Sequence, residues 1–365
     1  MKKYDIKEFA VIPPPYGGVT VFVHRLINRL SEDGYSTGGF YSNENHDKKI
    51  RDSTLFEEFN YNPNETKVRR VLNHLQKIKI ALSYRIIHFH GLETMFVPWL
   101  LMRVYRKKIV ITVHSAMIVD FYERTSWLNK FFLSRLAQSN AQWIAVSEQA
   151  KKEMYKLPFC FKKNIPVIPA YIPISTNMQY SLPESMSKYI DGHKKNISFY
   201  GRSFMKYKEH DVYGFETIIE LYSLIVKKYD DEIGLVLCIS ESSDTDKISG
   251  IKQLAKELGV SEKIYWQIGP LDSLQSLWHK TDIYIRPTFT DGDSVAVREA
   301  VDAGMAVIAS DVCTRPEEVV TYRFDDFEDL YQKTIDALNI QNRVVKTNDV
   351  YYNQMKDIYI SMLNQ

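Results

Sequence analysis

The 365-residue sequence has few cysteines, little net charge and no repetitive or low-complexity tract. Its three cysteines, Cys160, Cys238 and Cys313, lie far apart and form no CxxC pair, which argues against a disulfide framework or a zinc site and for a reducing compartment. The formal net charge of +2 gives no reason to expect nucleic acid as a partner. Local basic patches remain possible in a chain with this charge.

The sequence also has little that suggests membrane insertion or export. Its most apolar window, 94–105, is well short of the roughly 20 residues that a spanning helix needs. Near the start, Asp5, Lys7 and Glu8 stand where a secretory signal would have an apolar core. We therefore expect a cytoplasmic protein, and leave open contact with the inner face of the plasma membrane.

Length and apolar content point to two α/β domains. The length favours two domains over one, and 45% hydrophobic residues suffice for two buried cores. Short apolar runs alternate with stretches of helical periodicity, which predicts parallel sheets covered by helices on both faces. The expected strands are 9–12, 38–41, 85–90, 109–113, 143–146, 166–168, 196–200, 234–239, 263–267, 282–286 and 306–309. The expected helices are 19–34, 65–82, 93–105, 127–138, 148–155, 212–228, 246–258, 272–279, 295–303 and 348–363.

A polar segment without periodicity, 174–195, is interpreted as the interdomain linker. The prediction is an N-terminal domain of residues 1–180, a C-terminal domain of residues 190–345 and a final helix within 346–365 that returns to the first domain.

The first expected strand runs directly into PPPYGG, residues 13–18, and then into an amphipathic helix that ends at Gly34. A strand, a glycine loop and a helix form an anion-binding arrangement, because glycine lets backbone N–H groups approach a phosphate at the helix N-terminus. The pair Gly17 and Gly18 is equally consistent with a tight turn.

A second strand, loop and helix unit spans 282–309. Pro287 ends the strand, Ser294 is a helix cap, and Gly304 stands where a helix C-terminus favours glycine. In open α/β sheets ligands bind beyond the carboxyl ends of the strands, so the loop with Asp291 and Asp293 is expected at a ligand site.

Several short motifs occur in one order along nearly the whole chain. They are PPPYGG at 13–18, HFHG at 88–91, TVHS at 112–115, AVSEQAKKEM at 145–154, VIPAYIP at 167–173, YGR at 200–202 and DGDSVAVRE at 291–299. Together they resemble the retaining, nucleotide-sugar-dependent glycosyltransferases of the GT-B fold, of the family 4 or group 1 type. The resemblance implies two Rossmann-like domains facing each other across a cleft, the first for the acceptor and the second for the donor.

The family's signature is two acidic residues separated by seven others, and Asp291 and Glu299 have that spacing. The resemblance implies that Asp291 binds hydroxyls of the donor sugar and that Glu299 holds the nucleotide ribose, both suitable tasks for carboxylates. Without the family, Asp291 and Asp293 read as turn residues and Glu299 as an exposed helix position. Asp291 stands where the family usually has a glutamate, which is one methylene longer.

The donor diphosphate needs positive partners. Arg202 with either Lys206 or Lys208 resembles the family's arginine and lysine pair, and the spacing does not decide between the lysines. Ser294 and the N–H groups of Val295 and its neighbour would add the helix dipole. Gly17 and Gly18 are further donor-site candidates, and the alternative for the basic run is a solvated loop.

Three histidines, His88, His90 and His114, lie in or directly after expected strands of the first half. His114 occupies the position where the family often has a histidine near the donor sugar, and we favour it over His90 as the catalytic candidate beside Asp291. His88 and His90 alternate on one strand and are also consistent with buried positions. With no third ligand nearby, the pair is not interpreted as a metal site.

Metal is not expected at the acidic loop either. Asp291-Gly292-Asp293 spells the DxD that other glycosyltransferases use for metal binding, but those enzymes have a different fold. We expect a metal-independent enzyme with no cofactor. Its partners would be a nucleotide-sugar donor, a UDP-sugar in the first place, and a saccharide acceptor, with no nucleic acid.

Two stretches of the first half, 95–108 and 127–137, mix Trp, Phe and Leu with Arg and Lys. Such stretches lie in the interface of anionic membranes, and they equally form core-facing helices with a basic edge. On the first interpretation the acceptor is lipid-linked and the enzyme builds bacterial surface polysaccharide. The rival functions are an inverting transferase or epimerase that uses Glu93 as base, and a catalytically silent GT-B binding protein.

Overall fold

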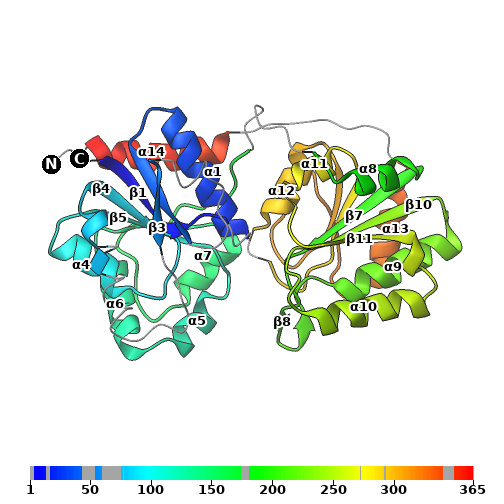
Figure 1. Ribbon diagram of the computed structural model, residues 1–365. Helices are drawn as coiled ribbons and strands as arrows, with labels where there is room; N and C mark the ends of the chain where they lie inside the picture. Colours follow the sequence, from blue (N-terminus) through cyan, green and yellow to red (C-terminus); the bar gives the residue numbers. More distant parts are fainter. Residues whose placement is uncertain are drawn as a thin grey trace. The chain divides into compact units, whose positions relative to one another are not determined.

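The computed structural model describes residues 4–13, 17–42, 54–59, 75–76, 78–173, 181–271, 273–291, 293–339 and 349–364. The chain divides into two compact units, which Figure 1 shows in ribbon form. Unit 1 comprises Met1–Ile172 and Asp349–Gln365, and unit 2 comprises Pro173–Asn348. Each unit is built on one six-stranded parallel sheet.

In unit 1 the chain alternates between strand and helix as the periodicity predicts. Its strands are β1 (Tyr4–Val11), β2 (Thr37–Ser42), β3 (Phe56–Phe59), β4 (Tyr84–Phe89), β5 (Lys108–Val113) and β6 (Gln142–Ala145). Its labelled helices are α1 (Gly18–Glu32), α4 (Phe96–Arg103), α5 (Ile118–Arg124), α6 (Trp127–Ala137), α7 (Glu148–Tyr155) and α14 (Val350–Asn364).

Both faces of the unit 1 sheet are covered. One core joins alternate strand residues such as Ile6, Ile86 and Val110 to the apolar faces of α1 and α14. The other joins the intervening residues, among them Ile87 and Ile111, to α4, α6 and α7. Helices on both sides explain why these strands read as continuous apolar runs in the sequence.

Unit 2 repeats the architecture. Its strands are β7 (Lys195–Gly201), β8 (Lys206–Tyr207), β9 (His210–Asp211), β10 (Ile233–Ile239), β11 (Ile264–Ile268), β12 (Ile283–Arg286), β13 (Ala306–Ser310) and β14 (Val320–Tyr322). Its helices are α8 (Glu184–Asp191), α9 (Phe215–Lys228), α10 (Thr245–Glu257), the 3₁₀ turn Ser261–Lys263, α11 (Gln275–Trp278), α12 (Val295–Asp302) and α13 (Phe327–Leu338).

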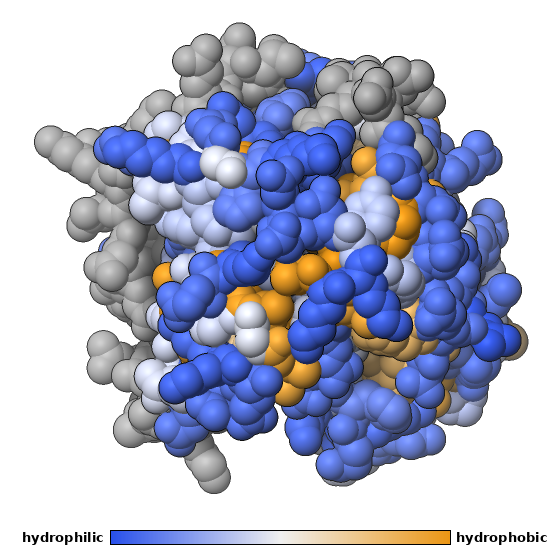
Figure 2. Space-filling view, turned by 90° about the vertical axis from the view of Figure 1, so that its right-hand side faces the viewer, coloured by the Kyte–Doolittle hydropathy of each residue, from blue (hydrophilic) through white to orange (hydrophobic). Residues whose placement is uncertain are grey.

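The helices of unit 2 also divide between two faces of its sheet. Helices α9, α10 and α13 pack on one core, and α8, α11 and α12 pack on the other. The face of this unit that is drawn in Figure 2 is largely hydrophilic, with hydrophobic residues between charged and polar ones. Such scattered apolar surface is usual for a protein exposed to water.

The strand order is the same in both units. It runs β3-β2-β1-β4-β5-β6 in unit 1 and β11-β10-β7-β12-β13-β14 in unit 2, with parallel pairing throughout. This is the Rossmann order, in which the chain reverses direction across the sheet between the first and fourth strands of the unit. Ligands of such sheets bind at that point, which is β1/β4 in unit 1 and β7/β12 in unit 2. The expected fold class is confirmed.

Several element predictions need correction. Strand β1 begins at Tyr4 instead of residue 9, because the charged residues Lys7 and Glu8 are fully buried with partners and stay within the sheet. Residues 166–168 form only an isolated bridge between Val167 and Ala145. Of the helix expected at 65–82, residues 75–76 and 78–81 are helical, and 65–74 lie outside the described residues. Elements β3, α5, α8, β8, β9, β14 and α13 were not predicted.

The segment expected as a linker, 174–195, belongs largely to unit 2. Helix α8 lies within it, with Met186 and Ile190 buried one turn apart on its inner face. Pro183 precedes the helix and Gly192 ends it, which is the usual order of these two residues. The prediction was wrong because only one turn of α8 is apolar, too little to show a period.

Helix α14 is the part of unit 1 that is most distant in sequence. Its buried residues Tyr352, Met355, Tyr359 and Met362 pack in the core beneath α1. At its start Arg29 pairs with Asp349 at 2.6 Å, and at its end Arg85 and Lys108 donate hydrogen bonds to its last carbonyls. Cations at a helix C-terminus satisfy free carbonyls and complement the dipole.

Among the residues described here, no helix is both long and apolar enough to cross a bilayer.

We predict that Met355→Ala destabilises unit 1 by about 2–5 kcal/mol, because it leaves a cavity in a close-packed core. Met355 is 1% exposed. Gln354→Ala, an exposed position on the same helix, serves as control and should change stability by less than about 0.5 kcal/mol. Urea unfolding followed by circular dichroism measures both, and equal stability of the two variants would show that α14 is only loosely attached.

Candidate functional site

In unit 2 two loops leave the sheet at the β7/β12 switch point. The first follows Gly201 at the end of β7, where any Cβ would overlap the ring of Phe215. The second follows Arg286 at the end of β12 and leads through Asp291 and Asp293 into α12. Because the two strands are neighbours in a parallel sheet, the predicted residues Arg202 and Asp291 follow adjacent strand ends.

The Asp291 carboxylate is held by two arginines that the sequence patterns do not reveal. Its Oδ2 accepts hydrogen bonds from Arg286 Nε at 3.3 Å and from Arg315 Nη1 at 2.9 Å. Burial raises the pKa of Asp291, but the charges of Arg286 and Arg315 outweigh it and the pKa is lowered. Asp291 is therefore an anion at neutral pH and no ordinary turn residue.

Arg315 reaches Asp291 from the loop after β13. Its Nε donates to the carbonyl of Ser310 at 3.1 Å and its Nη2 to Thr288 Oγ1 at 3.2 Å. Arg286 donates to the carbonyl of Tyr200 at 3.3 Å. Neither arginine belongs to a sequence motif. An isolated arginine at a strand end or in a loop is usually expected to be solvated.

Asp293 has its own arginine. Arg298 Nε lies 2.8 and 3.0 Å from the two carboxylate oxygens. Burial is the main influence on Asp293 and raises its pKa, while Arg298 acts in the opposite direction. Between the two acids, Gly292 lies outside the described residues.

Helix α12 starts where the sequence predicts. The Ser294 hydroxyl accepts a hydrogen bond from the N–H of Val297 at 3.3 Å, so Ser294 caps a helix whose first residue is Val295. One turn on, Glu299 is 7% exposed and lies 3.4 Å from the indole N–H of Trp278. Its burial excludes the interpretation of Glu299 as an exposed helix position.

The basic residues after β7 form an open surface. Arg202, Lys206 and Lys208 are all exposed, and the lysines lie on the β8 and β9 hairpin and its turn. Lys208 has a positive φ of 49° and its ammonium lies 5.3 Å from the ring of Tyr207. This geometry does not choose between the two lysines.

In unit 1 the corresponding switch point lies between β1 and β4. Gly17 is the extended N-cap of α1 and Gly18 its first residue, so both lie at a helix N-terminus beyond β1. His90 follows the end of β4, and His114 follows the end of the next strand, β5. The rings of His90 and His114 are hydrogen bonded, Nδ1 to Nε2, at 2.9 Å.

A polar cluster extends from these histidines into the sheet, on the face that α14 covers. Oε2 of the fully buried Glu8 lies 2.7 Å from His90 Nε2 and 3.0 Å from His88 Nδ1. The hydroxyl of Tyr359 donates to Glu8 Oε1 at 2.9 Å, and His88 Nε2 lies 2.7 Å from Thr112 Oγ1. Glu8 was expected outside the sheet, so this cluster was not predicted.

The protonation of the cluster follows from its contacts. Burial raises the pKa of Glu8, but the charge and hydrogen bond of His88 and the hydrogen bond of His90 outweigh it and lower the pKa to about 2. Burial lowers the pKa of His90 to about 4, and that of His114 well below its usual value. At neutral pH Glu8 is therefore an anion, and the rings of His90 and His114 are neutral.

The expectation that the histidine pair lacks a third potential metal ligand is wrong. Glu8, His88 and His90 present ligand atoms within 4.8 Å of one another. The same atoms are joined by direct hydrogen bonds of 2.7–3.0 Å, and all three residues are fully or almost fully buried. The cluster is thus satisfied as a hydrogen-bond network.

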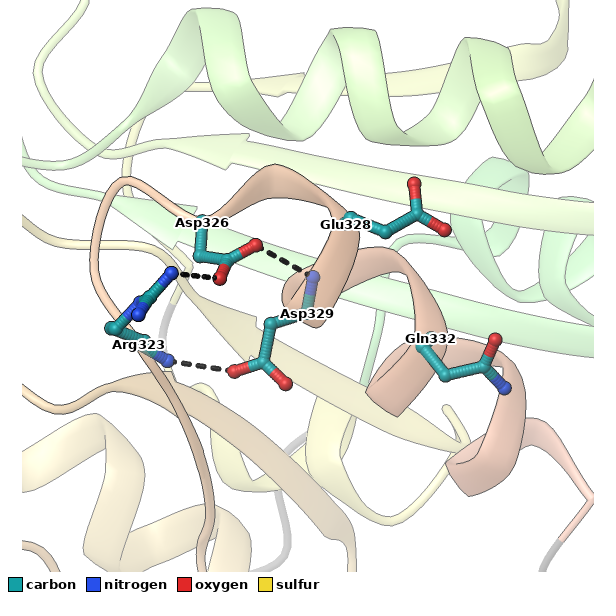
Figure 3. Close-up of a pocket in the computed structure, with 5 residues that line it drawn as sticks. All are labelled: Arg323, Asp326, Glu328, Asp329 and Gln332. Carbon is teal, nitrogen blue, oxygen red and sulfur yellow. Dashed lines mark hydrogen bonds and ion pairs between the residues drawn. The ribbon is translucent and has the colours of Figure 1, made fainter.

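A pocket on the surface of unit 2 lies at the start of α13 (Figure 3). Arg323 bonds to Asp326 at 2.7 Å through its guanidinium and to Asp329 at 2.8 Å through its backbone N–H. Asp326 also caps α13 by accepting from the N–H of Asp329. These contacts form a helix start, and none of the predicted site residues lines the pocket.

Comparison with known proteins identifies the fold and the family. The family model Glycosyltransferase Family 4 matches residues 16–175, and the model Glycosyl transferases group 1 matches residues 187–326. The chain belongs to the GT-B glycosyltransferases. No curated protein sequence matches it.

Solved structures agree with this assignment of the glycosyltransferase fold. Sucrose-phosphate synthase from Thermosynechococcus elongatus is 16% identical, with a TM-score of 0.73 over 99% of this chain and 100% of that one. Anabaena HepE in complex with UDP and glucose is 13% identical, with a TM-score of 0.73 over 98% and 99%. A glycosyltransferase from Rickettsia africae is 15% identical, with a TM-score of 0.75 over the whole of both chains.

Glu93, the base of the rival inverting or epimerase hypothesis, is exposed, and its carboxylate folds back over Gly91, where a Cβ would overlap it.

We predict that Asp291→Asn lowers the stability of unit 2 by about 3–5 kcal/mol, because it leaves Arg286 and Arg315 buried without a counter-charge. Asp231→Asn, which breaks a surface pair with Lys263, is the matched control and should cost less than about 1 kcal/mol. Thermal unfolding by differential scanning calorimetry measures both. Adding Arg315→Met to Asp291→Asn should restore part of the loss, and a double variant less stable than the single one would contradict the ion-pair assignment.

Proposed function

We propose that this glycosyltransferase moves a sugar from a UDP-sugar to a saccharide or lipid-linked saccharide acceptor, with retention of anomeric configuration, in the synthesis of bacterial surface polysaccharide. The observation that carries the donor assignment is the acid pair Asp291 and Glu299 around the capped start of α12, at the switch point of unit 2. The UDP in the complex of the similar HepE structure supports the choice of nucleotide.

The diphosphate is assigned to the start of α12 and to the basic residues after β7. The first N–H groups of a helix have no partner within it, so those of Val295 and Ala296 are suited to bind phosphate oxygens. Arg202 with Lys206 or Lys208 supplies positive charge from an exposed loop. Charge that grows on the leaving diphosphate is then met by fixed donors.

Asp291 is assigned to the sugar, and Glu299 to the ribose. Both arginines of Asp291 contact Oδ2, and the described residues show no hydrogen bond to Oδ1, which is left to accept a sugar hydroxyl. Glu299 is held in place beside Trp278, and a buried carboxylate is a strong acceptor for paired hydroxyls. In unit 1, His114 with Gly17 and Gly18 is assigned to the donor side of the reaction.

Metal independence is part of the proposal. Each acid of the apparent DxD is already bound to arginine, Asp291 to Arg286 and Arg315 and Asp293 to Arg298. A divalent ion at this loop would have to displace these charges.

We predict that Glu299→Gln raises the Kd for UDP at least about tenfold, since one hydrogen bond from a ribose hydroxyl to a charged acceptor contributes about 1.5–3 kcal/mol. Isothermal titration calorimetry with UDP measures it, with Glu220→Gln on the exposed face of α9 as control. A panel of UDP-sugars and acceptors then tests turnover in the presence of EDTA, and NMR of the product reads the anomeric configuration. Unchanged UDP affinity in Glu299→Gln would refute the assignment of Glu299 to the ribose. Inversion of the anomeric configuration would refute retention, and activity restored only by Mn²⁺ would refute metal independence.

The acceptor hypothesis rests on an exposed surface of α4 and α6, which we call the aromatic surface. Its apolar members are Phe96, Trp127, Leu128 and Phe131, of which Trp127 is 78% exposed. The two helices are joined by ring contacts of Phe132 with Phe96 and Trp99 at 5.2 and 5.0 Å. Exposed Arg103, Arg106 and Arg135 lie on the same helices or directly after them, which suits an anionic lipid surface.

We predict that Arg103→Glu with Arg106→Glu weakens binding to vesicles containing phosphatidylglycerol by about 2 kcal/mol or more, at about 1 kcal/mol for each cation lost. Lys107 is left unchanged because its ammonium donates to the carbonyls of Leu82 and Tyr84. The control, Lys227→Glu with Lys228→Glu, makes the same charge change on α9 of unit 2. Vesicle co-sedimentation measures binding, and equal loss in both variants would leave only a non-specific charge effect.

A further inference from the structure

Three histidines and one glutamate of unit 1 form a continuous hydrogen-bond chain from the sheet interior to a strand end. Glu8 lies on β1 opposite His88 of β4 in register, and His90 is two residues further along on the same face. The chain runs from Glu8 Oε2 to His90 Nε2 at 2.7 Å, and from His90 Nδ1 to His114 Nε2 at 2.9 Å. It ends at His114, which is partly exposed.

The direction of each hydrogen bond follows from the acceptor at the buried end. An ionised carboxylate only accepts, so His90 must donate from Nε2 to Glu8. A neutral imidazole carries one N–H, so Nδ1 of His90 is then an acceptor and Nε2 of His114 must donate to it. Nδ1 of neutral His114 is consequently left unprotonated, and the described residues show no hydrogen bond to it.

The surroundings maintain this arrangement. Glu8 is also bonded to Tyr359 on α14, and His88 to Thr112 on β5, so α14 and three neighbouring strands enclose the carboxylate. Lys7, the residue before Glu8, points to the opposite face of the sheet and pairs with Glu57 at 3.1 Å. Phe22 of α1 packs edge-on against the rings of His90 and His114, at 6.0 and 5.9 Å between centroids. Both rings are therefore fixed by packing as well as by hydrogen bonds.

We propose that Glu8 is a positioning residue that acts through His90 to hold His114 as the Nε2-protonated neutral tautomer, with Nδ1 as the acceptor for a hydroxyl of the donor sugar. The role of Nδ1 rests on the proposed function, because it gives His114 a sugar to bind. The tautomer itself does not depend on any substrate. A fixed acceptor needs no reorganisation as the sugar passes through the transition state.

Glu8→Gln tests the chain because it replaces an anion by a group of the same shape. Its N–H₂ at the Oε2 position would donate to Nε2 of His90 and reverse both tautomers along the chain, and Glu8→Leu, which removes the acceptor whichever way the amide is turned, is measured beside it. Tyr359→Phe is the matched control, since it removes the hydrogen bonds of its hydroxyl with Glu8 Oε1 and with His88 Nδ1 but leaves the path through His90 intact. His90→Asn and His114→Asn assign the ring signals.

The experiment is long-range ¹H–¹⁵N NMR of the full-length protein labelled with ¹⁵N-histidine, recorded at pH 7 without substrate. We expect Nδ1 of His114 to give the signal of an unprotonated ring nitrogen in the wild type and in Tyr359→Phe, and that of a protonated one in Glu8→Gln. An unchanged His114 signal in both Glu8→Gln and Glu8→Leu would overturn the proposal. Stoichiometric zinc in the purified protein, detected by mass spectrometry, would also overturn it if removal of the zinc by a chelator changed the ring signals of His88 and His90.

Kinetics then separate this proposal from the proposed function. With an active donor and acceptor pair, Glu8→Gln should lower kcat by about 10- to 100-fold, the usual effect of losing an outer-shell partner. The Kd for UDP should stay unchanged, and Tyr359→Phe should keep kcat within about threefold of wild type. Equal loss of kcat in both variants would reduce Glu8 to a structural residue. A protein that shows the predicted tautomers but transfers no sugar would refute the function and leave the positioning role standing.

Discussion

Charge that is buried in or beside a parallel sheet needs hydrogen-bond or ion-pair partners within the protein, and this constraint determines how both candidate sites are built. A sheet covered by helices on both faces leaves no water beside its strands. An unpaired charge there costs several kcal/mol, so every acid or base near a strand end needs a partner of fixed geometry. Glu8 in unit 1 and Asp291 in unit 2 are the two centres around which such partners gather.

The two units satisfy the constraint with different partners. In unit 1 a single carboxylate is surrounded by imidazoles and hydroxyls, and the pKa of His90, lowered to about 4 by burial, keeps that ring neutral. In unit 2 two arginines share one oxygen of Asp291, Arg298 pairs with Asp293, and the indole N–H of Trp278 donates to Glu299. A helix N-terminus and the exposed basic residues after β7 both favour an anionic ligand. Unit 2 is thus the half of the chain suited to a diphosphate.

The sequence predicts the architecture well because the alternation of apolar runs depends only on burial. Strand and helix order, the cap at Ser294 and the start of α12 follow from local patterns. What it misses are contacts between residues far apart in the chain. Glu8 reads as a polar interruption until β4 brings His88 and His90 to it and α14 adds Tyr359, 351 residues further on. Arg315 reads as an exposed loop residue until β13 places it beside Asp291.

These distant contacts also bear on the length of Asp291. A side chain one methylene shorter than glutamate has less reach and less freedom, so its position depends more on what holds the loop. Here Arg286 comes from the end of β12 and Arg315 from the loop after β13, and each is bonded to backbone carbonyls, of Tyr200 and Ser310 respectively. The carboxylate is therefore positioned by two neighbouring strands of the sheet. The same two arginines also fix the direction of Oδ1 of Asp291. An aspartate held in this way has a defined position, whereas a longer glutamate would depend more on its own rotamers.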